Sequence, residues 1–124
     1  MFLFILYYFF SPFIFLSLVI FSIFNKKIRI LLFNQKKSLL NISSKLNSNK
    51  TKIIIHAASA GEYEQIKPLL KIIDRDIYFI IVSCMSPTVF KSIKDDGLSD
   101  LNCYHPFDFP WSANYFFKTI SPSI

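Results

Sequence analysis

A triple isoleucine runs directly into a turn of small residues in this chain: residues 53–62 are Ile-Ile-Ile-His-Ala-Ala-Ser-Ala-Gly-Glu. The β-branched run favours a short strand buried on both faces. After the turn, apolar residues recur at helical spacing from Ile66 to Ile73, which predicts a helix with one apolar face. The segment therefore indicates a strand, a tight turn, and a helix that begins near Gly61 or Glu62.

The same alternation continues along the rest of the chain. After the next apolar run, Ser86 offers an N-cap hydroxyl and Pro87 suits the first helical position, which predicts the start of a helix. Gly97 is typical of a helix end. Pro68 is expected to bend the first of these helices or to mark a tight first turn. The predicted elements are strands at residues 53–55, 77–82 and 101–104, and helices at residues 87–94 and 113–120. This order predicts an α/β fold with a Rossmann-like parallel sheet.

The first 24 residues contain no charged side chain. As a helix they would extend about 36 Å, more than a hydrocarbon core of about 30 Å. Pro12 would kink this helix, which membranes tolerate. No basic residue precedes the apolar run and no small-residue cleavage site follows it, which argues against a signal peptide. The basic residues follow the run, so the positive-inside rule predicts one transmembrane anchor and a cytoplasmic body.

Charge is unevenly distributed in the chain. Residues 1–61 contain eight basic and no acidic residues, whereas residues 62–124 contain eight acidic and six basic ones. A basic segment beside an apolar one is typical of contact with an anionic membrane surface. The sequence pI of about 9.4 would also suit nucleic acid. However, Phe33 is the only aromatic residue of the basic stretch, which disfavours base stacking, so no nucleic-acid partner is predicted.

These observations divide the chain into three parts. They are an anchor at residues 1–24, a basic juxtamembrane segment at residues 25–50, and an α/β domain at residues 51–124. Residues 28–33 could continue from the anchor as an interfacial helix, and residues 47–49 are typical of a loop. Cys84 and Cys103 have neither CxxC nor Cys/His ligand spacing, so we predict no metal site and two reduced, buried thiols.

A function can be argued from the turn after the first strand. Ligands of parallel sheets bind beyond the carboxyl ends of the strands, and the small residues there allow close approach to the backbone. Glu62, the first acidic residue of the chain, would stand at a helix N-terminus, where it stays ionised and can act as a general base. Ser59 and Glu62 also match a capping box, in which Glu62 only caps its own helix.

Other candidates each have a structural alternative. His56 is at a strand end, where a hydrogen-bonded structural histidine is the commoner case. His105 and Asp108 flank prolines and could simply order a turn, while Ser86 and Thr88 are most simply helix caps. The chain has no dinucleotide-binding motif, no phosphate-binding loop and no Ser/His/Asp order.

Residues 52–122 resemble the N-terminal domain of 3-deoxy-D-manno-octulosonic acid (Kdo) transferases. An apolar N-terminus and a basic stretch come first, and residues 56–62 match the family's His-x-x-Ser-x-Gly-Glu. Ser86-Pro87-Thr88 is similar to its Thr/Ser-Pro-Thr/Ser turn. Residues 104–110 (Tyr-His-Pro-Phe-Asp-Phe-Pro) resemble its Tyr-x-Pro-x-Asp-x-Pro segment.

The resemblance implies the N-terminal half of a GT-B glycosyltransferase of lipopolysaccharide biosynthesis at the inner membrane. Such an enzyme transfers Kdo from CMP-Kdo to a lipid A precursor, and it uses no cofactor or metal. Glu62 would be the general base. Substrate binding would involve Ser59, Gly61, Ser86 and Thr88.

The same resemblance implies that part of the enzyme is missing. The family's second acidic motif and its donor-binding domain lie beyond the matched residues. We therefore expect an N-terminal fragment that is inactive alone and that depends on a separately encoded C-terminal domain. The alternative is a non-catalytic, membrane-tethered α/β module or a decayed remnant.

Overall fold

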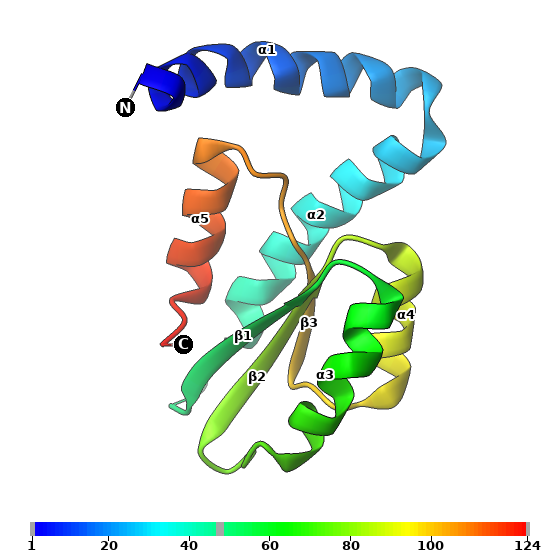
Figure 1. Cartoon of the computed structure of the whole chain (residues 1–124), viewed down its shortest axis with the longest axis vertical. Helices are drawn as coiled ribbons and strands as arrows, with labels where there is room; N and C mark the ends of the chain where they lie inside the picture. Colours follow the sequence, from blue (N-terminus) through cyan, green and yellow to red (C-terminus); the bar gives the residue numbers. More distant parts are fainter. Residues whose placement is uncertain (1, 47–48, 124) are drawn as a thin grey trace.

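The computed structural model describes residues 2–46 and 49–123, and in them an α/β unit is built on three parallel strands. These are β1 (Thr51–Ala57), β2 (Tyr78–Cys84) and β3 (Leu101–Tyr104), in the order β1-β2-β3 (Figure 1). A helix joins each strand to the next, as parallel neighbours require. The predicted α/β fold with a parallel sheet is confirmed.

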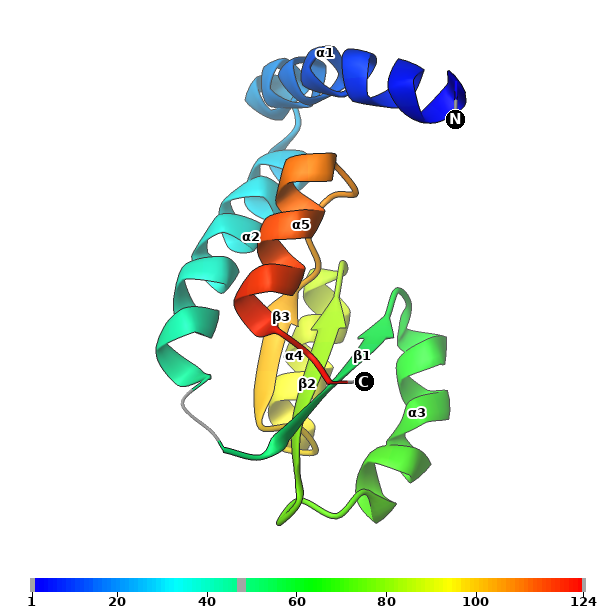
Figure 2. The ribbon, with the colours of Figure 1, turned by 90° about the vertical axis from the view of Figure 1, so that its left-hand side faces the viewer.

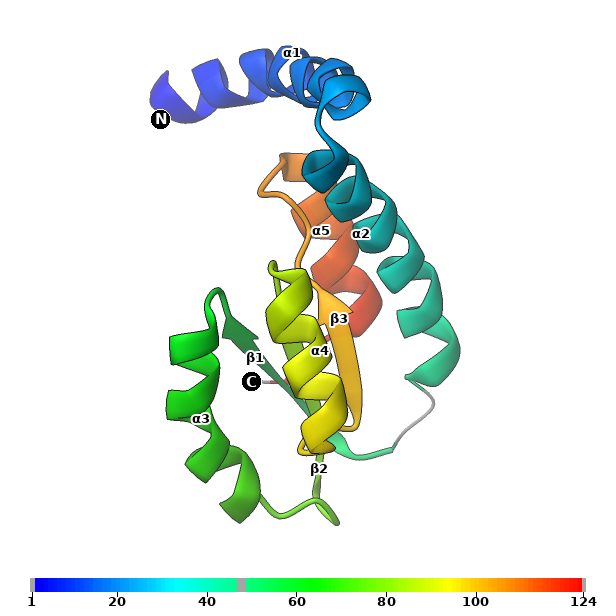
Figure 3. The ribbon, with the colours of Figure 1, turned by 90° about the vertical axis from the view of Figure 1, so that its right-hand side faces the viewer.

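Two helices cover each face of the sheet. Figures 2 and 3 show α3 (Ala60–Ile72) and α4 (Pro87–Asp96) on one face, and α2 (Lys26–Lys45) and α5 (Pro110–Ile120) on the other. Successive side chains of a strand point to opposite faces. Accordingly Ile80 and Val82 of β2 pack under α3 and α4, while Ile81 packs under α2 and α5. The sheet therefore separates two hydrophobic cores.

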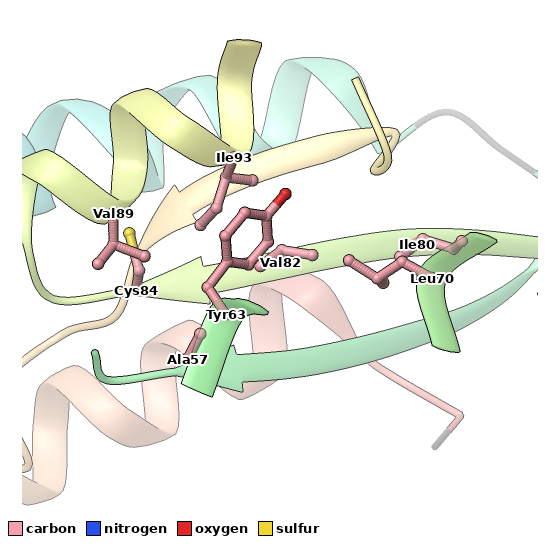
Figure 4. Packing of buried hydrophobic residues seen from close by; sticks show 8 residues of the cluster. All are labelled: Ala57, Tyr63, Leu70, Ile80, Val82, Cys84, Val89 and Ile93. Carbon is pink, nitrogen blue, oxygen red and sulfur yellow. The ribbon is translucent and has the colours of Figure 1, made fainter. Parts of the chain in front are cut away.

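The core under α3 and α4 fixes the start of α3 (Figure 4). Its largest side chain, Tyr63, is 1% exposed and lies between the sheet and the helices. Burial raises the pKa of Tyr63 to about 12, and the nearby Asp96 carboxylate adds to this. A fully buried side chain of this size contributes about 2–3 kcal/mol of hydrophobic stabilisation. Because Tyr63 follows Glu62 directly, its burial holds that carboxylate at the edge of the sheet.

The three isoleucines of β1 are less buried than predicted. Ile53, Ile54 and Ile55 are each half-buried, whereas the central residues of β2 are fully buried. The expectation of a strand buried on both faces was wrong because β1 pairs with β2 alone among the described strands.

Two helices begin earlier than expected. Helix α3 begins at Ala60, because Ser59 is its N-cap, so Pro68 lies well inside the helix and not in its first turn. Pro68 has no N–H to donate to the Glu64 carbonyl, which removes one helical hydrogen bond. Helix α5 begins at Pro110, three residues before the predicted start, because proline suits the first helical position.

The N-terminal region consists of two consecutive helices. Helix α1 (Phe2–Phe24) contains Pro12 and has a mean hydropathy of 2.3; within the described residues, no other helix is long and apolar enough to cross a membrane. Helix α2 follows after Asn25 and packs against β3 and α5, with Ile42 buried at the contact. Contact between α2 and a membrane surface stays a prediction, and the loop predicted at residues 47–49 lies largely outside the described residues.

Cys84 and Cys103 are free and buried, as predicted. They belong to different cores, since Cys84 faces α3 and α4 while Cys103 faces α2 and α5. Burial raises the pKa of each thiol to about 12. The thiols are therefore packing groups and not nucleophiles.

Candidate functional site

The carboxyl ends of the three strands meet at one edge of the sheet. Ala57 is in register with Cys84, and Cys84 is in register with Tyr104. The turns that follow these residues therefore begin side by side (Figure 2). This is the edge at which parallel α/β sheets bind ligands, and all the predicted site residues lie on or beside these turns.

The carboxylate of Glu62 is held by its own turn. Its Oε2 accepts a 2.9 Å hydrogen bond from the Ala58 N–H, and its Oε1 accepts one of 3.2 Å from the Ser59 hydroxyl. Ser59 Oγ in turn accepts the Glu62 N–H at 3.3 Å. The capping box is thus formed, except that the Glu62 carboxylate accepts the N–H of Ala58, the residue before the N-cap, and not that of Ser59. Glu62 remains exposed, and a carboxylate has about four acceptor sites. Sites therefore remain for a substrate hydroxyl.

Gly61 leaves open space beside this carboxylate. A methyl group added there would meet only Ser59 Oγ, at 4.0 Å. The glycine also has no positive φ that would exclude other residues. Neither packing nor backbone conformation within the described chain requires glycine at this position, although glycine weakens a helix. The open space is available to a ligand.

Ser86 and Thr88 carry hydroxyls that are not used for capping. Ser86 is the N-cap residue of α4 by position but makes no side-chain capping bond, and within the described residues the Thr88 hydroxyl has no partner. Both residues line a groove of about 440 Å³ against the first turns of α2, with Lys27 on its opposite side. The groove is largely apolar, with Ile28, Ile30, Leu31 and Met85 in its lining. Glu62 does not line it, so the site residues fall into two neighbouring groups.

The structure brings together two histidines that the sequence analysis considered separately. The rings of His56 and His105 are 4.5 Å apart, and His56 Nδ1 lies 3.0 Å from the hydroxyl of the fully buried Ser83. His105 also packs edge-on against Phe116. Burial lowers the pKa of His105, and the neighbouring His56 lowers it further, while Asp108 partly opposes both effects. A proton on His105 is therefore disfavoured in the folded protein.

Helix α2 contributes two residues that sequence reasoning missed. Gln35 donates through Nε2 to the His105 carbonyl at 2.9 Å, and its Oε1 accepts the Phe107 N–H at 3.4 Å. The Ser38 hydroxyl accepts the Tyr104 N–H at 2.9 Å. Both polar side chains are buried. The sequence did contain one indication of them, because the spacing of residues 35, 38 and 42 places all three on one face of a helix.

The apolar helix α1 touches the turn after β3 as well. The Tyr7 hydroxyl donates to the Asp108 carbonyl. Phe15 packs edge-on against Phe109 and Trp111, with ring centroids 5.5 and 5.9 Å away. The third turn of the site is thus held between α2 and α1.

A comparison with protein families is consistent with this arrangement. A family model for the N-terminal domain of glycosyltransferases, described as 3-deoxy-D-manno-octulosonic-acid transferase (kdotransferase), matches residues 28–124. The α/β unit is therefore a glycosyltransferase domain of the GT-B type. More particularly, the chain belongs to the Kdo transferase family, and the match includes nearly all of α2. No curated protein and no solved structure matched the chain.

Proposed function

We propose that this chain is the acceptor-side half of a Kdo transferase of lipopolysaccharide biosynthesis, acting at the inner membrane with its body in the cytoplasm. The observation that carries the proposal is the Glu62 carboxylate, which a chain of this family presents, exposed and oriented, at the carboxyl edge of its sheet. The acceptor is a lipid A precursor and the donor is CMP-Kdo.

Glu62 accepts the proton of an acceptor sugar hydroxyl in this mechanism. The freed oxygen forms a bond to the anomeric carbon of Kdo while the bond from that carbon to the CMP phosphate oxygen breaks, and CMP leaves with the electron pair. The hydrogen bonds from Ala58 and Ser59 fix the direction of the carboxylate. The open space at Gly61 admits the sugar.

The groove beside Ser86 and Thr88 holds another part of the acceptor. Its two free hydroxyls and the Lys27 ammonium suit a phosphorylated sugar, and its apolar lining suits the beginning of an acyl chain. The basic residues of α2 add attraction to an anionic membrane surface. The donor is held by the C-terminal domain of the transferase.

Reconstitution tests the proposal. The full chain in lipid nanodiscs is mixed with the C-terminal domain of a Kdo transferase, CMP-Kdo and a lipid A precursor, and transfer is followed by mass spectrometry. Glu62→Gln should reduce transfer by at least about a hundredfold, while Glu64→Gln on the same helix retains it. Equal transfer by the Glu62→Gln variant and the unchanged chain would rule out Glu62 as the general base.

A second candidate is a non-catalytic, membrane-tethered module. The observation that favours it is the engagement of both Glu62 carboxylate oxygens in the cap of α3. It predicts no Kdo transfer with any complementing domain. It also predicts that Glu62→Gln changes only stability, by about 0.5–1 kcal/mol.

A further inference from the structure

A second groove follows β3 between α2 and α4. Its volume is about 450 Å³, and Leu101, Asn102 and Tyr104 of β3 form its floor. Three lysines line it: Lys37 and Lys45 from α2, and Lys94 from α4. None of these residues belongs to the turns of the proposed acceptor site.

The lysines of this groove lack neutralising partners. Within the described residues, no carboxylate lies within ion-pair distance of Lys37, Lys45 or Lys94. The acidic residue in the lining, Asp100, is already paired with Arg75 at 2.6 Å. Lys67 on α3, by contrast, has two carboxylate partners. The groove therefore carries an uncompensated positive charge that favours an anionic ligand.

The spacing of the lysines matches an extended peptide. Lys37 and Lys45 are eight residues apart on one helix, which is about 12 Å along its axis. An extended chain advances about 13 Å over four residues, and residues of equal parity face the same side. Acidic side chains at a first and a fifth position would therefore both face α2. An acidic side chain between these two positions, and an odd number of residues from each, would face Lys94 on α4.

The floor of the groove offers backbone groups to such a peptide. Strand β3 ends the described sheet, so it pairs with β2 on one side only. The His105 N–H donates to the Cys84 carbonyl at 2.8 Å, and because strand backbone groups alternate in direction, those of Leu101 and Cys103 face β2 while those of Asn102 face outward. At the carboxyl end of β3, Ser38 already holds the Tyr104 N–H, which limits how far a partner strand can pair.

We propose that this groove binds an extended acidic segment of another protein, which adds as a strand alongside β3 with its carboxylates on Lys37, Lys45 and Lys94. Backbone hydrogen bonds would supply affinity, and the lysines would select acidic residues on both sides of the strand. This inference does not depend on the proposed transferase function.

Fluorescence anisotropy of labelled peptides on the full chain in zwitterionic nanodiscs tests it. One seven-residue threonine peptide carries glutamates at its second, fifth and sixth positions, and a control peptide of equal charge carries them at its third, fourth and fifth. The first should bind at least about fivefold more tightly. Replacing Lys37, Lys45 and Lys94 together by Gln should weaken it by at least about tenfold. Replacing the exposed Lys36, Lys91 and Lys118 together by Gln should weaken it by less than about twofold.

Three outcomes would overturn the proposal. Equal losses in the two triple variants would show a response to net charge alone. Equal binding of the two peptides would show that the site does not require the glutamate spacing of an extended strand. Displacement by inorganic tripolyphosphate at a concentration lower than that of the peptide would show a site for small phosphorylated ligands instead.

Discussion

The Ser59–Glu62 turn shows how one side chain can be both structural and available. The Glu62 carboxylate accepts two hydrogen bonds from its own turn and still faces solvent. A capping role and a role in proton transfer therefore do not exclude one another here. The sequence pattern presented them as alternatives, because spacing alone does not show how many acceptor sites stay free.

The two glycines of the chain should respond to alanine in opposite ways. Gly61→Ala meets no close atom, so it should raise the free energy of unfolding by about 0.5 kcal/mol. Its methyl group would occupy the space proposed for the sugar, so Kdo transfer in the reconstituted enzyme should fall at least about fivefold. Gly97→Ala is the control, because its φ of 64° is left-handed and alanine there should cost about 1 kcal/mol. Urea unfolding measures both.

His105 should make the protein less stable in acid. Its pKa is lowered in the folded state, chiefly by burial and then by His56, so the unfolded chain binds a proton more readily. The stability it supports is complete above the unfolded value, about pH 6.5, and is lost as the pH falls toward the lower folded value. His105→Asn should therefore reduce the difference in melting temperature between about pH 7.5 and pH 5.5. An unchanged difference would contradict this interpretation.

Among the elements, α2 differs most from its sequence-based description. Its Lys, Asn and Ser content favoured a surface segment, and periodicity did not show that buried Gln35 and Ser38 bind the backbone after β3. Local patterns did predict the strands and α4, because β-branched runs, Ser86-Pro87 and Gly97 act through local backbone preferences. The pairing of His56 with His105 could not be predicted, because it depends on contacts between distant segments.

The hydrogen bonds of α2 should be strong determinants of stability. Ser38→Ala leaves the buried Tyr104 N–H without an acceptor, which should cost about 1–3 kcal/mol. Gln35→Ala removes two bonds to the same turn and should cost a similar amount. Lys36→Ala, between them and exposed, should change stability by less than about 0.5 kcal/mol. Chemical denaturation followed by circular dichroism would compare the three variants.

For the whole molecule, the two cysteines report on the two cores separately. Both thiols are fully buried with a pKa of about 12, so thiol reagents at about pH 8 should label neither in the folded protein. Both should label together on unfolding, because one sheet supports both cores. Mass spectrometry of time-resolved labelling would check this. Earlier labelling of Cys103 would show that the α2/α5 face opens on its own.

Asn25 joins helices α1 and α2 without a flexible linker, and α2 reaches the carboxyl edge of the sheet. Asn25 is bonded into the end of α1 through its N–H to the Phe21 carbonyl, and its side chain caps α2 at the Lys27 N–H. Helix α2 is in turn hydrogen-bonded to the turn after β3 through Gln35. A flexible tether would let the body drift from the bilayer by a distance that grows with tether length. At the membrane location that we propose, this junction would instead hold the carboxyl edge of the sheet at one distance from the bilayer, so that this edge would meet lipid-borne partners by diffusion in two dimensions.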